Sequence, residues 1–180
     1  IPRKHTIVAM PARRILQLGD PVLREVSAPV ARPEDARTLV RDLRATLHAF
    51  RRTHAFGRGI SAIQIGEPKR VIYLEFDGVP HPLINPAFES LSAKRFRLWD
   101  DCFSFPDLLV RVERSVSFRL RYQDPSGERK MLEGSGALSE LVQHEMDHLD
   151  GVLAVDRAVD KLSLCTRTEY ERRFQKKERD

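Results

Sequence analysis

The stretch Gln143-His144-Glu145-Met146-Asp147-His148 gives the strongest indication of what this chain folds around. Residues four apart on an α-helix lie on the same face, so the imidazoles of His144 and His148 can reach one metal ion. Glu145 directly follows the first histidine, which lets its carboxylate reach a water molecule on that metal. The alternative is a helix that carries two surface histidines by chance. Whether the helix has a buried face helps to decide between a metal site and this alternative.

The surrounding segment, Ala137 to Leu149, is predicted to be a helix with one buried face. Gly134-Ser135-Gly136 interrupts the chain before it, and Asp150-Gly151 ends it, glycine being the usual residue just past a helix C-terminus. Its apolar residues recur at helical spacing; they are Leu138, Leu141, Val142 and Leu149. A helix with such an apolar stripe packs against a core, so its chemistry is expected inside the domain.

Working outward from this helix, the sequence predicts an α+β fold. Short, mostly antiparallel strands pack around the central metal-binding helix, with one helix near each end of the chain. The N-terminal helix is predicted from Pro33 to Arg52, because apolar residues recur at helical spacing. The C-terminal helix is predicted from Asp160 to Lys177. Its expected docking points on the rest of the domain are Leu162, Tyr170 and Phe174.

Three segments are predicted to be strands. Val71 to Phe76 is a short apolar run, typical of a strand buried on both faces. Ser115 to Tyr122 alternates apolar and polar residues, which indicates one buried and one wet face. The turn Asp124-Pro125-Ser126-Gly127 leads to a hairpin partner at Arg129 to Leu132.

Length and composition indicate one globular domain covering residues 1–180. Hydrophobic residues make up 41% of the 180 and charged residues 32%, which is an ordinary globular composition. No apolar run is long enough to span a membrane. Residues 1–12 are interpreted as the remnant of a processed leader or an artificial extension.

The net charge is +5, but the basic residues are scattered. This favours a solvated basic surface over a nucleic-acid interface, and DNA is not an expected partner.

The chain has two cysteines, Cys102 and Cys165, too few for a disulfide framework. A reducing compartment is therefore expected, in which a thiolate can bind metal. Cys165 has no motif around it and is interpreted as a buried structural thiol.

A site with two histidines needs a third protein ligand and one open position for water. Glu169 lies downstream, at a spacing that resembles zinc metallopeptidases whose third ligand is a glutamate. Asp150 and Asp156 are nearer carboxylates. Cys102 lies upstream, and a thiolate is the most metal-avid of these groups, although an isolated cysteine is more often a small buried apolar residue.

Three segments together resemble the peptide deformylase family. The helix motif of that family, Gln-His-Glu-x-x-His, is matched by Gln143 to His148. Its cysteine motif, Glu-Gly-Cys-Leu-Ser, is answered by Asp100-Asp101-Cys102-Phe103-Ser104. Its glycine motif, Gly-x-Gly-x-Ala-Ala-x-Gln, is answered by Gly57 to Gln64. Softer similarities include Ile84-Asn85-Pro86, and they extend the resemblance over most of the chain.

The resemblance implies a metal-dependent hydrolase that removes the formyl group from the N-formyl-methionine of new polypeptides. Cys102, His144 and His148 would hold one metal ion per chain, typically Fe²⁺, with Ni²⁺, Co²⁺ or Zn²⁺ able to replace it. A water on the metal would be the nucleophile. Glu145 would act as general base and then as general acid.

The same resemblance implies further roles. Gln64 and the backbone N–H of Phe103 would stabilise the oxyanion at the formyl carbon. The peptide would lie extended beside Gly59 and Ile60, pairing main chain with main chain. An apolar pocket would take the methionine side chain.

The motifs also depart from the family. Asp101 stands where the family has glycine, Phe103 replaces leucine, Ser61 replaces alanine, and Arg58 is charged where the family is usually apolar. These departures leave the ligands intact but bear on rate and substrate preference. Asp100 is interpreted as a partner of Arg114, with a solvated Arg114 as the equal alternative.

Three other functions remain open at this point. They are a zinc endopeptidase using Glu169, a hydrolase of another small N-acyl group, and a non-catalytic relative that binds peptide or the ribosome. Formylated nascent peptides are the expected partners, with the ribosome surface as a further candidate. The expected location is the bacterial cytoplasm, or the mitochondrial or plastid matrix if the start is a processed leader.

Overall fold

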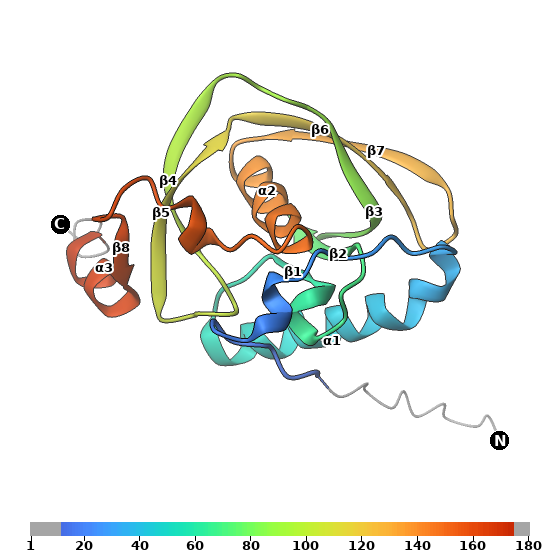
Figure 1. The fold of residues 1–180 in the computed structure, drawn as a ribbon, viewed down its shortest axis with the longest axis horizontal. Helices are drawn as coiled ribbons and strands as arrows, with labels where there is room; N and C mark the ends of the chain where they lie inside the picture. The colour runs from blue at the N-terminus through green and yellow to red at the C-terminus, as the bar shows by residue number, and fades with distance from the viewer. Residues whose placement is uncertain (1–11, 175–180) are drawn as a thin grey trace.

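The computed structural model describes residues 12–174, so the expected leader, apart from Ala12, and the end of the basic tail lie outside the described residues. The chain forms two antiparallel sheets around one central helix (Figure 1). Helix α2, Ala137–Leu149, has the bounds predicted from its flanking glycines. Within residues 12–174, no helix combines the length and apolarity needed to cross a membrane.

The larger sheet has the strand order β1-β2-β3-β6-β7, with all neighbours antiparallel. Its first strand, β1, is therefore an edge strand, and only one of its sides is paired. The strands of this sheet are β1 (Gly59–Ser61), β2 (Val71–Phe76), β3 (Val79–Leu91), β6 (Ser117–Gln123) and β7 (Arg129–Ser135).

The smaller sheet has the order β4-β5-β8. The loop between β4 and β5, residues 102–107, begins with Cys102 and is called the cysteine loop. Strand β4 ends at Asp101, directly before Cys102, and is paired along its length with β5. The strands are β4 (Arg95–Asp101), β5 (Leu108–Ser115) and β8 (Leu164–Thr166). Cys102 is thus placed at the end of a regular strand.

Helix α1, Arg37–His54, covers the larger sheet, and apolar side chains on both faces of that sheet form the core. Leu43 and Leu47 of α1 are fully buried against Val71 and Ile84, and Leu141 and Val142 of α2 pack with residues of the other face. The described part of the chain also contains four 3-10 turns: Pro21–Arg24, Pro33–Ala36, Ala62–Ile65 (η3) and Ala154–Arg157.

The structure corrects several predicted boundaries. The first helix begins as the 3-10 turn Pro33–Ala36, because proline fixes the first turn, and continues as α1. The predicted strand Ser115–Tyr122 is divided between β5 and β6, and β7 runs on to Ser135.

The tail shows the largest difference. Residues Leu164–Thr166 of it form β8, because they pair with β5, and within the described residues the helix is limited to Arg167–Phe174 (α3). Leu162 does not dock, being 81% exposed. Tyr170 and Phe174 do dock: their rings lie 5.9 and 6.2 Å from Trp99.

Candidate metal centre and active site

The Gln143 side chain fixes helix α2 against the junction of the two sheets. Its Oε1 accepts from the Ser115 N–H at 2.9 Å, and its Nε2 donates to the Ser115 carbonyl at 2.9 Å. Because the next residue is His144, these bonds set where that histidine points.

The side chains of Cys102, His144 and His148 come together in the interior, and all three residues are buried. Nε2 of His148 lies 3.2 Å from Cys102 Sγ and 3.2 Å from His144 Nε2. Within residues 12–174 this is the only group of three or more His, Cys, Asp or Glu residues whose ligand atoms lie within 4.8 Å of one another. The structure therefore brings together the three residues that the motifs single out.

This group fits a divalent metal. A tetrahedral ion with ligand bonds of about 2.0 to 2.3 Å separates its ligand atoms by roughly 3.3 to 3.6 Å. The two observed separations of 3.2 Å are close to that range. Two imidazole nitrogens and one sulfur form a donor set that suits zinc, iron, cobalt or nickel.

An acidic residue supports the first histidine from behind. Asp100 Oδ2 lies 3.0 Å from His144 Nδ1, which directs Nε2 toward the other ligands, as carboxylates behind metal-binding histidines do. Arg114 Nη2 pairs with the same oxygen at 3.0 Å in a fully buried contact, so the predicted pairing of Asp100 with Arg114 is confirmed. Arg114 also pairs with Asp147.

Charge neighbours shift the pKa values of these buried groups. Burial alone would raise the pKa of Asp100, but the charges and hydrogen bonds of His144 and Arg114 outweigh it and lower that pKa. Burial would lower the pKa of His144, yet Asp100 and Cys102 raise it well above its usual value. Burial and the neighbouring His144 together lower the pKa of His148.

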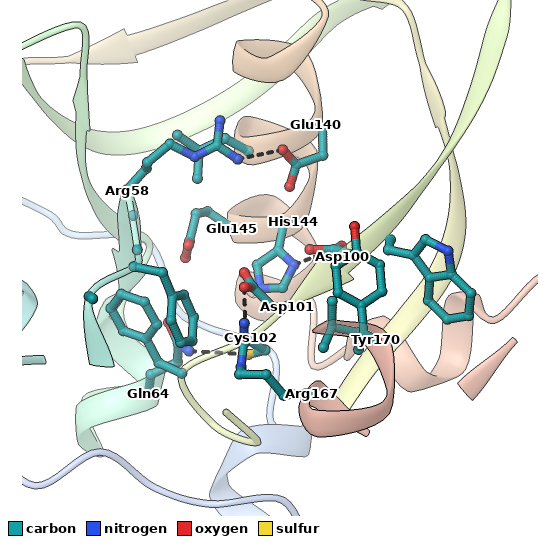
Figure 2. A pocket seen from close by; sticks show the side chains of 18 residues that line it. Arg58, Gln64, Asp100, Asp101, Cys102, Glu140, His144, Glu145, Arg167 and Tyr170 are labelled. Carbon is teal, nitrogen blue, oxygen red and sulfur yellow. Dashed lines mark hydrogen bonds and ion pairs between the residues drawn. The ribbon is translucent and has the colours of Figure 1, made fainter. Parts of the chain in front are cut away.

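Glu145 lines the same cavity as Cys102 and His144, and its side chain is buried (Figure 2). Ser61 Oγ donates to Glu145 Oε2 at 2.6 Å and also lies 2.9 Å from the Glu145 carbonyl oxygen. Burial raises the pKa of Glu145 to about 7, with Asp100 and Glu140 adding to the effect, against the opposing influence of His144 and Ser61. A carboxyl with that pKa can both accept and release a proton near neutral pH.

Strand β1 brings Gly59 and Ile60 to the same site. A Cβ on Gly59 would lie 2.8 Å from Glu145 Oε1 and 2.7 Å from Leu74 Cδ2, so only glycine fits there without movement. Ile60 buries its side chain in the core, and the backbone of β1 faces the cavity at the unpaired edge of the sheet.

Gln64, on the 3-10 turn η3, is buried next to the cysteine. Its Nε2 lies 3.6 Å from Cys102 Sγ and 3.3 Å from Ser104 Oγ. Its Oε1 accepts from the Ser61 N–H at 2.9 Å, which fixes the amide with its donor end toward the site.

Phe103 follows the cysteine and anchors the loop through its side chain. The ring stacks on Phe50 with centroids 3.8 Å apart, and it fills the space next to Gly57, where a Cβ would come within 2.2 Å. Gln17 Nε2 donates to the Phe103 carbonyl at 3.2 Å. The backbone of Phe103 is thereby held beside the metal ligands.

A cavity of about 610 Å³ opens onto these groups, and its walls carry several charged side chains. Figure 2 shows Arg58 reaching across the cavity to Glu140, with Arg167 pointing at Asp101 on the opposite side. Arg58 Nη2 lies 2.6 Å from Glu140 Oε2. The apolar pocket implied by the resemblance is therefore only partly apolar here.

Arg167 is a residue of this site that the sequence analysis missed. Its Nη2 pairs with Asp101 Oδ2 at 2.9 Å, its Nε donates to the Pro106 carbonyl at 2.7 Å, and its guanidinium lies 4.0 Å from the centre of the Phe56 ring. The negative charge of Asp101, which replaces glycine beside the cysteine, is therefore balanced by the first residue of α3. The sequence analysis also did not identify the hydrogen bond from Ser61 to Glu145 or the ion pair between Glu140 and Arg58.

The other candidate metal ligands lie elsewhere. Glu169 pairs with Arg172 on the same helix at 2.6 Å, Asp150 pairs with Arg70 at 2.7 Å, and Asp156 accepts from the Leu153 N–H. None belongs to the converging group, so the structure does not support a zinc endopeptidase that uses Glu169. Cys165 is buried in β8, as expected of a structural thiol.

Comparison with known proteins gives a consistent result. The family model described as polypeptide deformylase matches residues 12–163. Peptide deformylase of Bartonella tribocorum is 39% identical over 155 residues, covering 82% of this chain and 84% of that protein. The structure of the Thermotoga maritima peptide deformylase superposes with a TM-score of 0.78 at 32% identity, covering 84% of this chain and all of the other. The structure of the Synechococcus elongatus peptide deformylase in complex with actinonin superposes with a TM-score of 0.78 at 34% identity, covering 86% of this chain and 83% of the other.

Proposed function

The chain belongs to the polypeptide deformylase family, and from this premise we propose how its own residues perform the reaction of that family. The protein is a metal-dependent hydrolase that removes the formyl group from the N-formyl-methionine of new polypeptides. The observation that carries the assignment of roles is the convergence of Cys102, His144 and His148 beside the buried carboxylate of Glu145.

In this proposal Cys102 Sγ, His144 Nε2 and His148 Nε2 hold one metal ion per chain. The metal is Fe²⁺, and Ni²⁺, Co²⁺ or Zn²⁺ can replace it, since the sulfur and nitrogen donors suit all four ions. When bound, the metal acts as a Lewis acid that makes a water molecule nucleophilic near neutral pH. Asp100 and Arg114 are positioning residues, because they hold the His144 ring through its Nδ1.

Glu145 moves the proton. Its carboxylate accepts a proton from the attacking water and afterwards delivers it to the amine that leaves the formyl carbon. The pKa of about 7 allows both steps at the same pH, and the Ser61 hydroxyl holds the ionised form in place.

Two donors stabilise the oxyanion that forms at the formyl carbon. We assign them to Gln64 Nε2, which its bond to the Ser61 N–H directs toward Cys102, and to the backbone N–H of Phe103. Both come from segments with little freedom, since η3 is capped by Ser61 and Phe103 is packed on Phe50. Preorganised donors of this kind lower the barrier without reorganising during the reaction.

The peptide chain lies extended along the free edge of β1. Arg58 accepts from the Glu75 N–H, and the antiparallel alternation then directs the backbone groups of Ile60 toward Tyr73 of β2 and those of Gly59 toward the free edge. An extended peptide can pair with Gly59 there as an added strand, beside Ile60. In this proposal the first residue of the peptide lies between β1 and helix α2, with its formyl group at the ligands.

The wider setting is part of the same proposal. Residues 1–180 act as a single catalytic domain, and the substrates are formylated nascent peptides met at the ribosome surface. The cytoplasm of a bacterium is the expected location, supported by the bacterial origin of the relatives, with an organelle matrix as the alternative.

Formate release from a formyl-Met-Ala-Ser peptide tests the proposal, using protein prepared without oxygen and loaded with Fe²⁺ or Ni²⁺. Glu145→Gln is expected to abolish turnover while the metal stays bound, and Cys102→Ser is expected to lose the metal. Cys165→Ser is the matched control and should keep both. Absence of turnover by folded, metal-loaded protein would overturn the proposed function.

A further inference from the structure

An ion pair forms part of the cavity wall where the first side chain of a bound peptide would lie. Arg58 directly precedes β1, the strand that offers its free edge to the peptide. Glu140 lies four residues before His144 on α2, so the two side chains share one helix face, one turn apart. The Arg58–Glu140 pair thus spans the cavity between the peptide-binding edge and the helix of the metal ligands (Figure 2).

The pair is held firmly in this position. Glu140 has a side chain only 9% exposed, and its Oε2 lies 2.6 Å from Arg58 Nη2. Arg58 Nη1 also donates to the Ala137 carbonyl at 3.2 Å, and its own carbonyl accepts from the Glu75 N–H at 2.7 Å, which extends the pairing of β1 with β2. Backbone and side chain of Arg58 therefore both have hydrogen-bonded partners in the cavity wall.

The pair keeps unused hydrogen-bonding capacity on the cavity side. The guanidinium carries five N–H donors, of which the bonds to Glu140 and Ala137 use two. The bond to Arg58 uses Oε2 of Glu140, so Oε1 remains able to accept. An apolar side chain placed against the pair would remove water from these groups and offer nothing in exchange, which is unfavourable.

A primary amide matches both members of the pair. Its carbonyl can accept from Arg58 while its NH₂ donates to Glu140, and the methylene stem of a glutamine side chain can lie on the neighbouring Leu141 of the same cavity wall. A carboxylate would repel Glu140, and an ammonium would repel Arg58. A neutral polar end on an unbranched stem is therefore the side chain that this wall suits best.

We propose that the Arg58–Glu140 pair sets the specificity of the site and favours formylated peptides whose first side chain ends in a polar amide over those that begin with methionine. This inference rests on the proposed function, since it takes the formyl group to lie at Cys102, His144 and His148. It adds a second class of substrate to the reaction and assigns Arg58 and Glu140 the role of selecting it.

The test compares three formylated tripeptides that differ only in the first residue: glutamine, methionine and norleucine. All three side chains have an unbranched stem and similar length, and they differ in the polarity of the end. The metal-loaded protein is expected to show a kcat/KM for the glutamine peptide that exceeds that for the norleucine peptide by at least about tenfold, because a site that forms hydrogen bonds with a substrate rejects the analogue without them. Equal values, or a preference for norleucine or methionine, would overturn the inference.

The double variant Arg58→Met with Glu140→Met replaces the ion pair by apolar side chains of similar size. It is expected to reverse the order and turn over the methionine and norleucine peptides faster than the glutamine peptide. The matched control is Arg119→Met with Glu133→Met, which removes an ion pair of 2.7 Å on exposed strands of the larger sheet and should leave the ratios unchanged. Should the first variant fail to fold, the comparison of peptides on the unmodified protein still decides.

Calorimetric binding of the unformylated peptides Gln-Ala-Ser and Met-Ala-Ser separates this inference from the proposed function. Tighter binding of Gln-Ala-Ser supports the specificity of the Arg58–Glu140 wall even if no formyl peptide is hydrolysed, in which case the proposed function alone fails. Formate release from the methionine peptide, together with tighter binding of Met-Ala-Ser, supports the proposed function and overturns this inference.

Discussion

At the scale of single residues, the acid/base group of this site depends on one neighbouring hydroxyl. Ser61 Oγ donates to Glu145 Oε2 at 2.6 Å, and both groups are buried. A hydrogen bond to the ionised carboxylate favours that form and lowers the pKa of Glu145, while burial raises it to the resulting value of about 7. Ser61 stands where the resemblance has alanine, so this hydroxyl is a feature of this chain.

Ser61→Ala is therefore expected to raise the pKa of Glu145 and to shift the acid limb of the kcat/KM profile to higher pH. At neutral pH the rate should fall by up to about tenfold, the loss expected from one hydrogen bond worth about 1.4 kcal/mol. Formate release measured from pH 5 to 9 checks this. Ser61→Thr, which keeps the hydroxyl, is the control, and an acid limb that moves to lower pH in Ser61→Ala would contradict the assignment.

The ligands were predictable residue by residue, whereas their supports were not. His144, Glu145 and His148 stand in one helical motif, so local periodicity placed them on one helix, and Cys102 was found through its flanking motif. Arg167 carries no local signal, because its contact with Asp101 exists only once β8 has paired with β5. Side-chain contacts between distant segments depend on packing, which a single sequence does not reveal.

At the scale of elements, strand β1 requires a glycine for reasons of packing. The backbone conformation of Gly59 is open to other residues, but a Cβ would lie 2.8 Å from Glu145 Oε1. Gly59→Ala is expected to displace that carboxylate and to lower kcat by roughly a hundredfold, as misplacement of a catalytic group by about 1 Å can do. Metal content should be unchanged. Formate release and metal analysis on the same preparation provide the measurement.

Gly134→Ala is the matched control for this prediction. A Cβ there would lie 2.7 Å from Leu138 Cδ2, a contact as close as the one that Gly59 would make with Leu74, but away from the site. It is expected to lower stability without a comparable fall in kcat. If both variants lose activity in proportion to their stability, the special role of Gly59 in placing Glu145 is wrong.

Helix α3 contributes to the site through its first residue. Arg167 balances Asp101 next to Cys102, so Arg167→Gln leaves an uncompensated carboxylate beside the ligands and is expected to lower kcat/KM by roughly tenfold. Asp101→Asn in the same chain removes that charge and should restore part of the loss. A double-mutant cycle of the four proteins measures the coupling between the two residues, and additive effects would show that they act independently.

Elements defined by nearby residues in the sequence were predictable, whereas elements that form only by pairing with a distant segment were not. Helix α2 was predicted residue for residue, because the glycines before and after it act locally. Strand β8 was predicted as helix, because its three residues become a strand only through pairing with β5. The α+β class was predictable because helices α1 and α2 carry apolar residues at helical spacing and most of strand β6 alternates apolar and polar residues.

At the scale of the whole molecule, Glu75 links helix α1 to the larger sheet. Its carboxylate accepts from Tyr73 at 2.7 Å, lies 2.7 Å from His48 Nε2 and pairs with Arg51. These hydrogen bonds outweigh the effect of burial and lower the pKa of Glu75 from 4.5 to about 2. The contact ties the element that covers the core to the strand beside β1.

Glu75→Gln is expected to destabilise the fold at neutral pH by at most about 3 kcal/mol, the free energy that corresponds to the lowered pKa. A carboxyl whose pKa is lower in the folded state contributes its full stability above the unfolded pKa of 4.5 and loses it as the pH falls toward 2. The difference in urea midpoint between the two proteins should therefore be largest at pH 7, shrink below pH 4.5 and nearly vanish at pH 2, as urea titrations at these pH values can check.

Glu133→Gln is the control, because Glu133 pairs with Arg119 at a position 59% exposed and such pairs contribute little. Its urea midpoint is expected to follow that of the unmodified protein at every pH. Acid destabilisation from other carboxyls affects all three proteins alike and cancels in the comparison. A difference between Glu75→Gln and the unmodified protein that stays constant from pH 7 to pH 2 would mean that Glu75 acts through packing, and the link between α1 and β2 would then not depend on charge.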